Sequence, residues 1–229
     1  MATRRRAARD AAAAGGPADG ALADDVGGPD ATVRATARAL AKIDEASALM
    51  LVEGILDQVA LETAAAGRGL DLEAQGIVIT PIGGAHAIGR FLADLGPRAA
   101  RVRLTGLCDL READLFRRAV SDHFGSAHTA ADMESRGFFV CDRDLEDELI
   151  RALGTTGVEA LLDDEGDLAL FRAFQNQPAW RGRQPEAQLY RFLRSSARRN
   201  LRYARLLVDA ASARDALPRP LGALLTAAS

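Results

Sequence analysis

Four short, largely apolar runs separated by helix-like stretches are the feature that most constrains the fold of this chain. The runs occupy residues 48–52, 77–82, 102–107 and 138–141, and the helix-like stretches lie near 55–67, 86–95, 112–124 and 144–153. Strands with few polar positions are typical of parallel sheets, because helices cover both faces of such a sheet. The pattern therefore predicts an α/β domain with a parallel sheet of about four strands between helices.

The segments on either side of this pattern have a different composition. Residues 1–30 are rich in Ala, Gly, Asp and Arg and contain no aromatic residue, which predicts a disordered tail. Residues 31–46 predict a helix that leads into an α/β domain at 47–157, and residues 158–229 predict a C-terminal helical extension. Within that extension, residues 185–210 predict one long helix or two.

The overall composition is that of a soluble globular protein and excludes several classes. Of the 229 residues 48% are hydrophobic and 27% are charged, with a net charge of −3. That charge gives no general affinity for nucleic acid, although a local basic face remains compatible with it. No apolar run approaches the roughly 18 residues of a membrane span. Two isolated cysteines, Cys108 and Cys141, fit a reducing compartment, so we expect a cytoplasmic protein without membrane contact.

Acidic residues stand where three of the predicted strands end. Glu53 and Asp109 come at the ends of the first and third runs, and Asp57 and Glu112 follow a few residues later. The fourth run is followed by Asp142, Asp144, Glu146, Asp147 and Glu148. In parallel α/β sheets ligands bind outside the carboxyl ends of the strands, and Mg²⁺ prefers oxygen ligands. This placement indicates a metal site, where two ions could activate water and stabilise the leaving oxygen of a phosphodiester.

The same acids also have a purely structural interpretation. Asp144 and its neighbours, Asp147 above all, could cap a helix and favour its positive end, while Asp57 or Glu112 could be solvated helix residues. Composition and spacing alone leave both interpretations open.

A row of arginines lies along the predicted helical segment 185–210. Its members, at spacings of three and four residues and without interleaved acids, are Arg191, Arg194, Arg198, Arg202 and Arg205. A solvated polar face and a surface that contacts a phosphate backbone are both compatible with this pattern.

Four segments of the chain resemble, in order and spacing, the TOPRIM domain of the OLD (overcoming lysogenisation defect) family nucleases. They are "LMLVEGILDQVALE", "VITPIGGAHAIGRFLADLG", "VRLTGLCDLREADLFRRA" and "FFVCDRDLEDELIRALG", and the resemblance runs from about residue 48 to 210. It implies a Rossmann-like TOPRIM fold with a C-terminal helical extension. It also implies a DNA endonuclease activity that depends on Mg²⁺ or Mn²⁺, with two ions.

The resemblance also assigns roles to individual acids. It makes Glu53 a metal ligand that can act as a general acid or base, Asp57 a further acid of the "VEGxxD" segment, and Asp109 a ligand shared between metals. The family form Asp-x-Asp is not kept, because Arg111 takes the second position and Glu112 stands one residue later.

Later segments of the chain complete the site implied by the resemblance. Asp144 and Glu146 match the "DLE" of the family and could complete a second metal site. A basic residue that stabilises transition-state charge falls near Arg199 or Asn200, and the position favours Arg199.

The resemblance does not extend to an ATPase. Full-length OLD proteins carry an ATPase domain with a GxxxxGK[ST] phosphate loop, but Lys42, the only lysine, has no glycine near it. The glycines of "PIGGAHAIGR" lack the lysine and hydroxyl residue, and predict a tight turn and a helix start. We therefore expect no ATP site in this chain, DNA as substrate, a separate ATPase partner and, by analogy with OLD proteins, a homodimer. The alternative is a noncatalytic TOPRIM-like module that binds metal, nucleic acid or another protein.

Overall fold

The computed structural model describes residues 30–125 and 129–229 of the chain. The disordered tail predicted for residues 1–30 therefore lies, except for its last residue, outside the described residues. Within the described ranges, no helix combines the length and the apolar character that crossing a membrane requires.

Four parallel strands form one sheet in the order β2-β1-β3-β4. The strands are β1 (Ala48–Val52), β2 (Ile77–Pro81), β3 (Arg103–Asp109) and β4 (Phe138–Cys141). In register, Ala48 of β1 pairs with Ile77 on one side and with Arg103 on the other. The predicted parallel sheet is confirmed, and β1 and β3 occupy its centre, where two of the strand-end acids are placed.

Alternate residues of the central strand enter two separate hydrophobic cores. Ala48, Met50 and Val52 belong to one core, while Leu49 and Leu51 belong to the other. Successive side chains of a strand point to opposite faces, and both faces of this sheet are covered, so β1 contains no polar residue.

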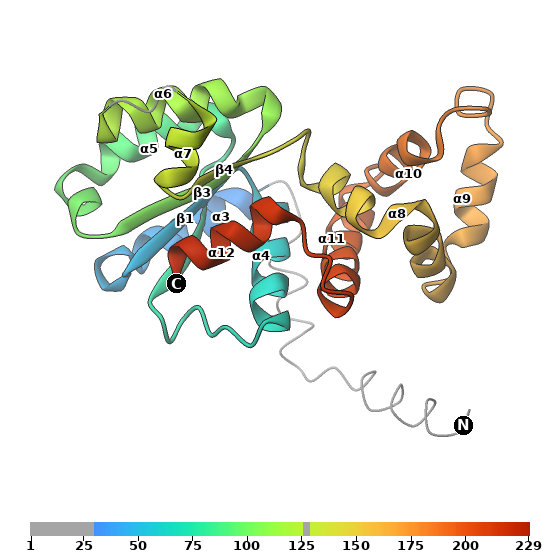
Figure 1. Ribbon diagram of the computed structural model, residues 1–229, viewed down its shortest axis with the longest axis horizontal. Helices are drawn as coiled ribbons and strands as arrows, with labels where there is room; N and C mark the ends of the chain where they lie inside the picture. The colour runs from blue at the N-terminus through green and yellow to red at the C-terminus, as the bar shows by residue number, and fades with distance from the viewer. Residues whose placement is uncertain (1–29, 126–128) are drawn as a thin grey trace.

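Helices cover the two faces of the sheet in distinct groups (Figure 1). One face carries α5 (Ile88–Leu95), α6 (Ala113–Phe124) and α7 (Ala130–Ser135), and the other carries α4 (Ile55–Gly67) and α12 (Arg219–Ala228). The leading helix predicted for 31–46 is α3 (Ala31–Ala41), followed by a 3-10 turn, Ile43–Glu45, and α3 packs against the edge strand β2. Three further 3-10 turns are Ala85–Ala87, Gly96–Ala100 and Leu110–Glu112.

Four more helices form the C-terminal extension beside the sheet (Figure 1). They are α8 (Leu145–Asp164), α9 (Leu168–Gln175), α10 (Pro185–Leu193) and α11 (Ala197–Ala213). Of the two arrangements expected for 185–210, the structure has two helices. The predicted boundary between residues 157 and 158 falls inside α8, which kinks at Gly154, where φ is 67°.

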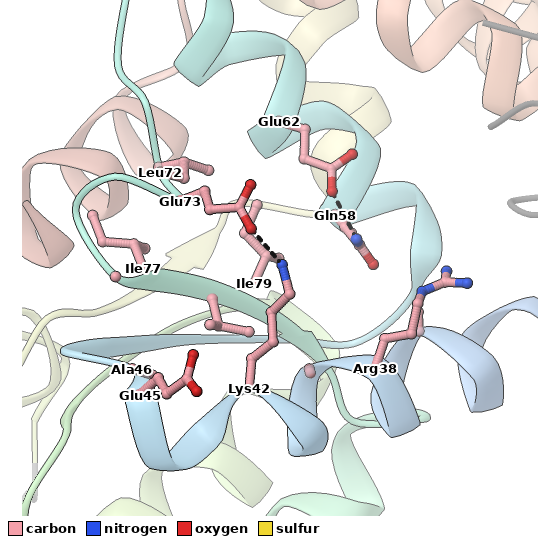
Figure 2. Close-up of a pocket in the computed structure, with 14 residues that line it drawn as sticks. Arg38, Lys42, Glu45, Ala46, Gln58, Glu62, Leu72, Glu73, Ile77 and Ile79 are labelled. Atoms are coloured by element: carbon pink, nitrogen blue, oxygen red, sulfur yellow. Dashed lines mark hydrogen bonds and ion pairs between the residues drawn. The ribbon is translucent and has the colours of Figure 1, made fainter. Parts of the chain in front are cut away.

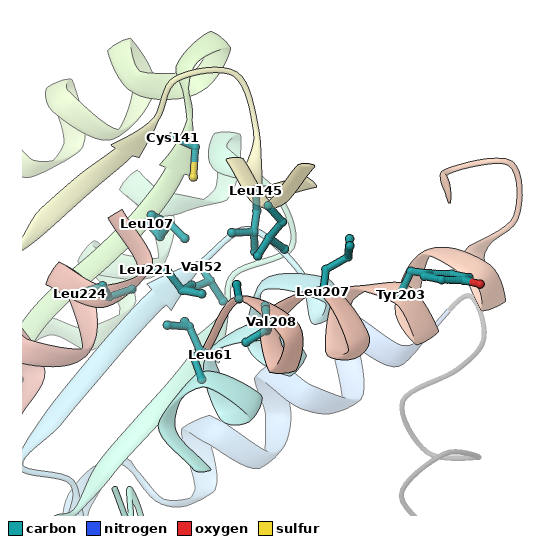
Figure 3. Packing of buried hydrophobic residues seen from close by; sticks show 14 of the residues in the cluster. Val52, Leu61, Leu107, Cys141, Leu145, Tyr203, Leu207, Val208, Leu221 and Leu224 are labelled. Atoms are coloured by element: carbon teal, nitrogen blue, oxygen red, sulfur yellow. The ribbon is translucent and has the colours of Figure 1, made fainter. Parts of the chain in front are cut away.

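The extension and the sheet share one hydrophobic core (Figure 3). Leu207 and Val208 of α11 belong to the same cluster as Leu61 of α4, Val52 of β1 and Leu221 of α12. Because α11 packs on α4 and α12 returns to the sheet, the helical extension is continuous in its packing with the α/β domain. This packing fixes α10 and α11 relative to the carboxyl ends of the strands.

Candidate metal centre

Glu53 links the carboxyl ends of the two central strands. It follows the last residue of β1, and its Oε1 accepts a hydrogen bond of 2.9 Å from the backbone N–H of Asp109, the last residue of β3. Two acids from segments far apart in sequence are thereby brought to one point, as the sequence predicts for neighbouring parallel strands.

A glycine turn holds the backbone at Glu53. The N–H groups of Gly83 and Gly84 donate to the Glu53 carbonyl at 3.2 and 3.0 Å. Both glycines have positive φ, 80° and 99°, a region that residues with a side chain rarely adopt. The turn predicted from "PIGGAHAIGR" therefore fixes the backbone at the end of β1, where Glu53 lies.

Asp57 approaches the same region from the first turn of α4. Its carboxylate accepts a hydrogen bond of 3.0 Å from the N–H of Gly54, so it caps the helix that follows β1. Burial and the charge of Glu146 raise the pKa of Asp57 to about 7, although the Gly54 N–H opposes that shift. Asp57 thus caps α4, and the same partly buried side chain lies among the other acids.

The pKa values of the strand-end carboxyls show how tightly the acids are grouped. Burial, contact with the Glu112 carboxyl and the charge of Asp109 raise the pKa of Glu53 to about 9. Burial, followed by the charges of Asp57 and Asp144, raises the pKa of Asp109 to about 7. Carboxyls of this kind resist ionisation because water has been removed and like charges are close.

Four of these acids have no counter-ion among the described residues, and we call them the strand-end acids: Glu53, Asp57, Asp109 and Glu112. Within the described residues, none of them forms an ion pair with Lys, Arg or His. In addition, Oε2 of Glu112 is buried and has no hydrogen-bond partner. A buried oxygen without a partner destabilises a fold unless something else satisfies it.

Two further acids, which we call the helix acids, lie at the start of α8 and bind side chains of α10 and α11 or of the turn between them. Asp144 caps α8 by accepting the N–H of Asp147 at 2.9 Å, and it also accepts the hydroxyl of Tyr190. Arg194 donates to Asp144 at 3.2 Å and to Glu146 at 3.0 Å. Glu146 also accepts the side-chain amide of Asn200 at 3.0 Å. Both helix acids are buried, with exposed fractions of 6% and 7%.

The neighbouring acids of α8 have structural partners instead. Asp147 pairs with Arg151 at 2.9 Å and with Arg143 at 3.5 Å, and Glu148 pairs with Arg151 at 3.1 Å. Asp142 lies 3.1 Å from the same Arg151. The structural interpretation of these three acids is therefore the better one.

The two acidic groups lie close to each other but are not arranged as a finished metal site. The charge of Glu146 acts on Asp57, and those of Asp144 and Glu146 act on Asp109. Among residues 30–125 and 129–229, no three His, Cys, Asp or Glu side chains already converge in a geometry that could hold a metal ion. Carboxylates without a cation repel one another, so ligation requires side-chain rotations that bring them inward. The donor set itself, six carboxylates with one buried oxygen unsatisfied, fits a hard divalent cation.

The five arginines of the predicted row make different contacts in the structure. Of the five arginines in the predicted row, Arg194 pairs with the helix acids, and Arg202 pairs with Glu165 and Asp167. The row is also broken, since α10 ends at Leu193 and α11 begins at Ala197. Arg191 and Arg198 are exposed, Arg205 is half-buried, and none of these three forms an ion pair within the described part of the chain.

Arg199, the predicted charge-stabilising residue, does not contact the acids. Its guanidinium lies over the Phe192 ring, 4.3 Å from the centroid, and donates to Ser195. Asn200, the alternative at this position, bonds to Glu146 instead. Sequence reasoning missed the contacts of Tyr190, Arg194 and Asn200 with the helix acids. One signal was present: Ser196 accepts the N–H of Arg199 as the N-cap of α11, and such a cap marks the helix break that turns Arg194 toward α8.

One of the two most prominent pockets in the described structure lies elsewhere. It has a volume of about 390 Å³ and lies between α3, α4 and the edge strand β2 (Figure 2). Lys42 pairs with Glu73 at 2.9 Å across it, and Gln58 bonds to Glu62 at 2.7 Å. None of the six candidate ligands lines this pocket.

Comparison with known proteins agrees with this architecture. Residues 46–110 match the family model described as "Overcoming lysogenization defect protein-like, TOPRIM domain". The C-terminal region of the Xanthomonas campestris pv. campestris OLD protein is 20% identical, with a TM-score of 0.57 over 82% of this chain and 94% of that chain. The C-terminal region of the Burkholderia pseudomallei OLD protein is also 20% identical, with a TM-score of 0.57 over 80% of this chain and 96% of that chain. No curated protein matches the chain at a significant level. The resemblance to an OLD-type TOPRIM domain and the predicted fold class are both confirmed.

Proposed function

We propose that this chain, which carries an OLD-like TOPRIM domain, is a divalent-metal-dependent endonuclease that hydrolyses or nicks DNA phosphodiesters. A cytoplasmic setting, a separate ATPase partner and a homodimer belong to the same proposal. The observation that carries it is the group of strand-end acids: they are partly buried, their charges raise the pKa of Glu53 and Asp109, and they have no counter-ion among the described residues. A domain that used these side chains only for its own stability would gain nothing from grouping like charges.

The proposed cofactor is Mg²⁺ or Mn²⁺, with two ions. Glu53, Asp57, Asp109 and Glu112 would hold one ion, and Asp144 and Glu146 would complete the second site. When bound, such ions supply Lewis acidity toward the phosphate and activation of a water molecule. Glutamate and aspartate oxygens from two strand ends and two helices suit this demand.

The residues of the chain contribute positioning, proton transfer and substrate contact. The Asp109 N–H orients the Glu53 carboxyl, and the pKa of about 9 keeps a proton on that group at neutral pH before a cation arrives. Glu53 is therefore suited to hold or release a proton at Oε2 beside the scissile bond. Arg191, Arg198 and Arg205 are proposed to contact the phosphate backbone, together with Arg194 and Arg202 if their present partners release them. Arg199 is proposed to stabilise transition-state charge after its side chain leaves the Phe192 ring.

One observation favours a second candidate function, a noncatalytic module that binds metal, nucleic acid or a protein partner. The second acid of the family's Asp-x-Asp is replaced by Arg111, which is exposed on the turn after β3 and cannot ligate a cation. Glu112, one residue later, is proposed to supply the missing carboxylate, because its side chain contacts that of Glu53.

Cleavage of supercoiled plasmid DNA with Mg²⁺, Mn²⁺ or EDTA distinguishes the two functions. We expect nicking that requires metal, that EDTA abolishes and that Glu53→Ala removes without unfolding the protein. Equal activity of wild type and Glu53→Ala would refute the proposed site. Metal binding without cleavage, on both plasmid and single-stranded DNA, would support the noncatalytic module.

A further inference from the structure

Arg194 holds the position of a cation between the two helix acids. Its Nη1 lies 3.2 Å from Oδ2 of Asp144 and 3.0 Å from Oε1 of Glu146, so one nitrogen bridges two carboxylates. The side chains of these acids are only 8% and 10% exposed, whereas that of Arg194 is 39% exposed. The guanidinium thus closes the acidic site from the solvent side.

Neighbouring residues hold Arg194 in this place. It follows the last residue of α10, and its guanidinium lies 4.9 Å from the centroid of the Tyr190 ring, one helical turn earlier. On the opposite side of that helix break, Asn200 of α11 bonds to the same Oε1 of Glu146. The contact therefore depends on how two helices of the extension dock on α8.

Both carboxylate oxygens of Asp144 already accept hydrogen bonds while Arg194 is bound. Its Oδ1 accepts the Asp147 N–H at 2.9 Å, and its Oδ2 accepts both Tyr190 and Arg194. The Asp147 N–H belongs to the first turn of α8 and cannot leave without unwinding that turn. An ion that takes Oδ2 of Asp144 or Oε1 of Glu146 as ligand must therefore replace the guanidinium, which it also repels.

We propose that Arg194 is the resident cation of Asp144 and Glu146 in the metal-free protein, and that a divalent ion binds these acids in competition with it. The inference rests on the proposed function, because it concerns the second of the two proposed ion sites. It makes Arg194 a positioning residue that lowers the metal affinity of the helix acids. The strand-end acids, which have no such cation, bind their ion first.

Calorimetric titration of the full chain with Mn²⁺ tests this competition in wild type, Arg194→Gln and Arg191→Gln. Arg194→Gln keeps a hydrogen-bond donor but removes the charge, and we expect it to bind the second Mn²⁺ at least about tenfold more tightly. Arg191→Gln is the matched control, since Arg191 is exposed on α10 and has no ion pair among the described residues; its affinity stays at the wild-type value. A residue that merely supported the fold would weaken binding when replaced.

The possible results distinguish a failure of the proposed competition between Arg194 and the ion from a failure of the proposed metal-dependent function. Unchanged or weaker binding by folded Arg194→Gln, with binding intact in wild type, overturns the competition alone. No Mn²⁺ binding by either protein overturns the proposed function and the competition together.

A measurement on the wild-type protein covers the case in which Arg194→Gln fails to fold. Nuclear magnetic resonance of the arginine side chains should show the Arg194 guanidinium signal moving on addition of Mg²⁺ while that of Arg191 stays in place. An Arg194 signal that does not change at saturating Mg²⁺ overturns the competition.

Discussion

The two acidic groups at the carboxyl end of the sheet contain the same kind of side chain in opposite states. The helix acids are buried beneath Arg194, Tyr190 and Asn200, so the folded chain itself neutralises them. Of the strand-end acids, Glu53 and Asp57 each accept a backbone N–H, none forms an ion pair within the described residues, and the pKa of Glu53 rises to about 9. The difference shows that acidic clustering alone does not identify a metal ligand. The informative feature is a group of carboxyls that the protein leaves without a cation.

The largest effect that separates the two groups is expected in catalysis. Asp109→Asn removes a strand-end charge while preserving the shape of the side chain, and cleavage should fall by roughly a hundredfold or more because metal and substrate charge are no longer balanced. Asp114→Asn, at an exposed acid on α6, is the matched control and should keep full activity. The rate at which each variant nicks supercoiled plasmid measures the effect. Comparable losses in the two variants would show that the strand-end acids have no special role in cleavage.

The helix acids should instead show their largest effect in stability. Glu146→Gln leaves Arg194 with one fewer charged partner in a buried site, so the free energy of unfolding of the metal-free protein should fall by about 1–3 kcal/mol. Glu159→Gln removes a more exposed ion pair with Arg172 and should cost less than about 1 kcal/mol. Urea denaturation with EDTA present compares the two, and a gain in stability for Glu146→Gln would contradict the assignment.

Replacing a strand-end acid should instead raise the free energy of unfolding of the metal-free protein. Asp57→Asn removes a carboxyl whose ionised form is disfavoured, while the amide oxygen can still accept the Gly54 N–H, so the metal-free protein should become more stable by about 1–2 kcal/mol at pH 8. Asp71→Asn keeps a similar backbone contact at an exposed position and should change stability by less than about 0.5 kcal/mol. Mg²⁺ should raise the melting temperature of Asp71→Asn as it does wild type, but that of Asp57→Asn much less.

The pH dependence of stability follows from the same carboxyls. Their folded pKa values are about 7 for Asp57 and Asp109 and about 9 for Glu53, each above the ordinary value of a carboxyl. The folded state therefore holds protons that the unfolded state has lost, and the metal-free protein should lose stability as the pH rises from about 5 to 9. Thermal melts in EDTA and in Mg²⁺ should diverge over this range, because the cation replaces the protons. Parallel curves would show that these acids bind no metal.

The smallest effect concerns the neutral donor to the helix acids. Tyr190→Phe removes the hydroxyl that bonds to Asp144 but leaves the ring beneath Arg194, so stability should fall by about 0.5–1.5 kcal/mol with little change in cleavage. Urea denaturation and plasmid nicking on the same preparation check this. A loss of activity as large as that of Asp109→Asn would make Tyr190 part of the catalytic site.

The sequence predicted the sheet and its acids because the relevant signals are local. A strand buried on both faces must be apolar along its length, as in 48–52 and 138–141, and the carboxyl end of each strand follows from chain direction. The sequence alone therefore predicts that Glu53 and Asp109 lie together at one end of the sheet. The turn at Gly83 and Gly84 was likewise foreseen, although its hydrogen bonds to Glu53 were not.

The partners of the helix acids could not be predicted in the same way. They depend on where α10 ends and how α11 docks on α8, and a regular spacing of arginines gives no sign of either. The apparent row assigned Arg194 and Arg202 to one surface, but the helix break at residues 194–196 and the ion pairs with Glu165 and Asp167 separate them. Contacts between residues some 50 positions apart, such as Tyr190 with Asp144, arise from tertiary packing alone.

Titration of Mn²⁺ into wild type and into a Glu53→Gln, Asp109→Asn double variant shows directly whether the strand-end acids form the metal centre. The account predicts that wild type binds the ion and that the double variant, still folded by circular dichroism, loses at least the tighter of the two binding events. Equal affinity and stoichiometry in the two proteins would contradict it, because the strand-end acids would then not be the metal centre.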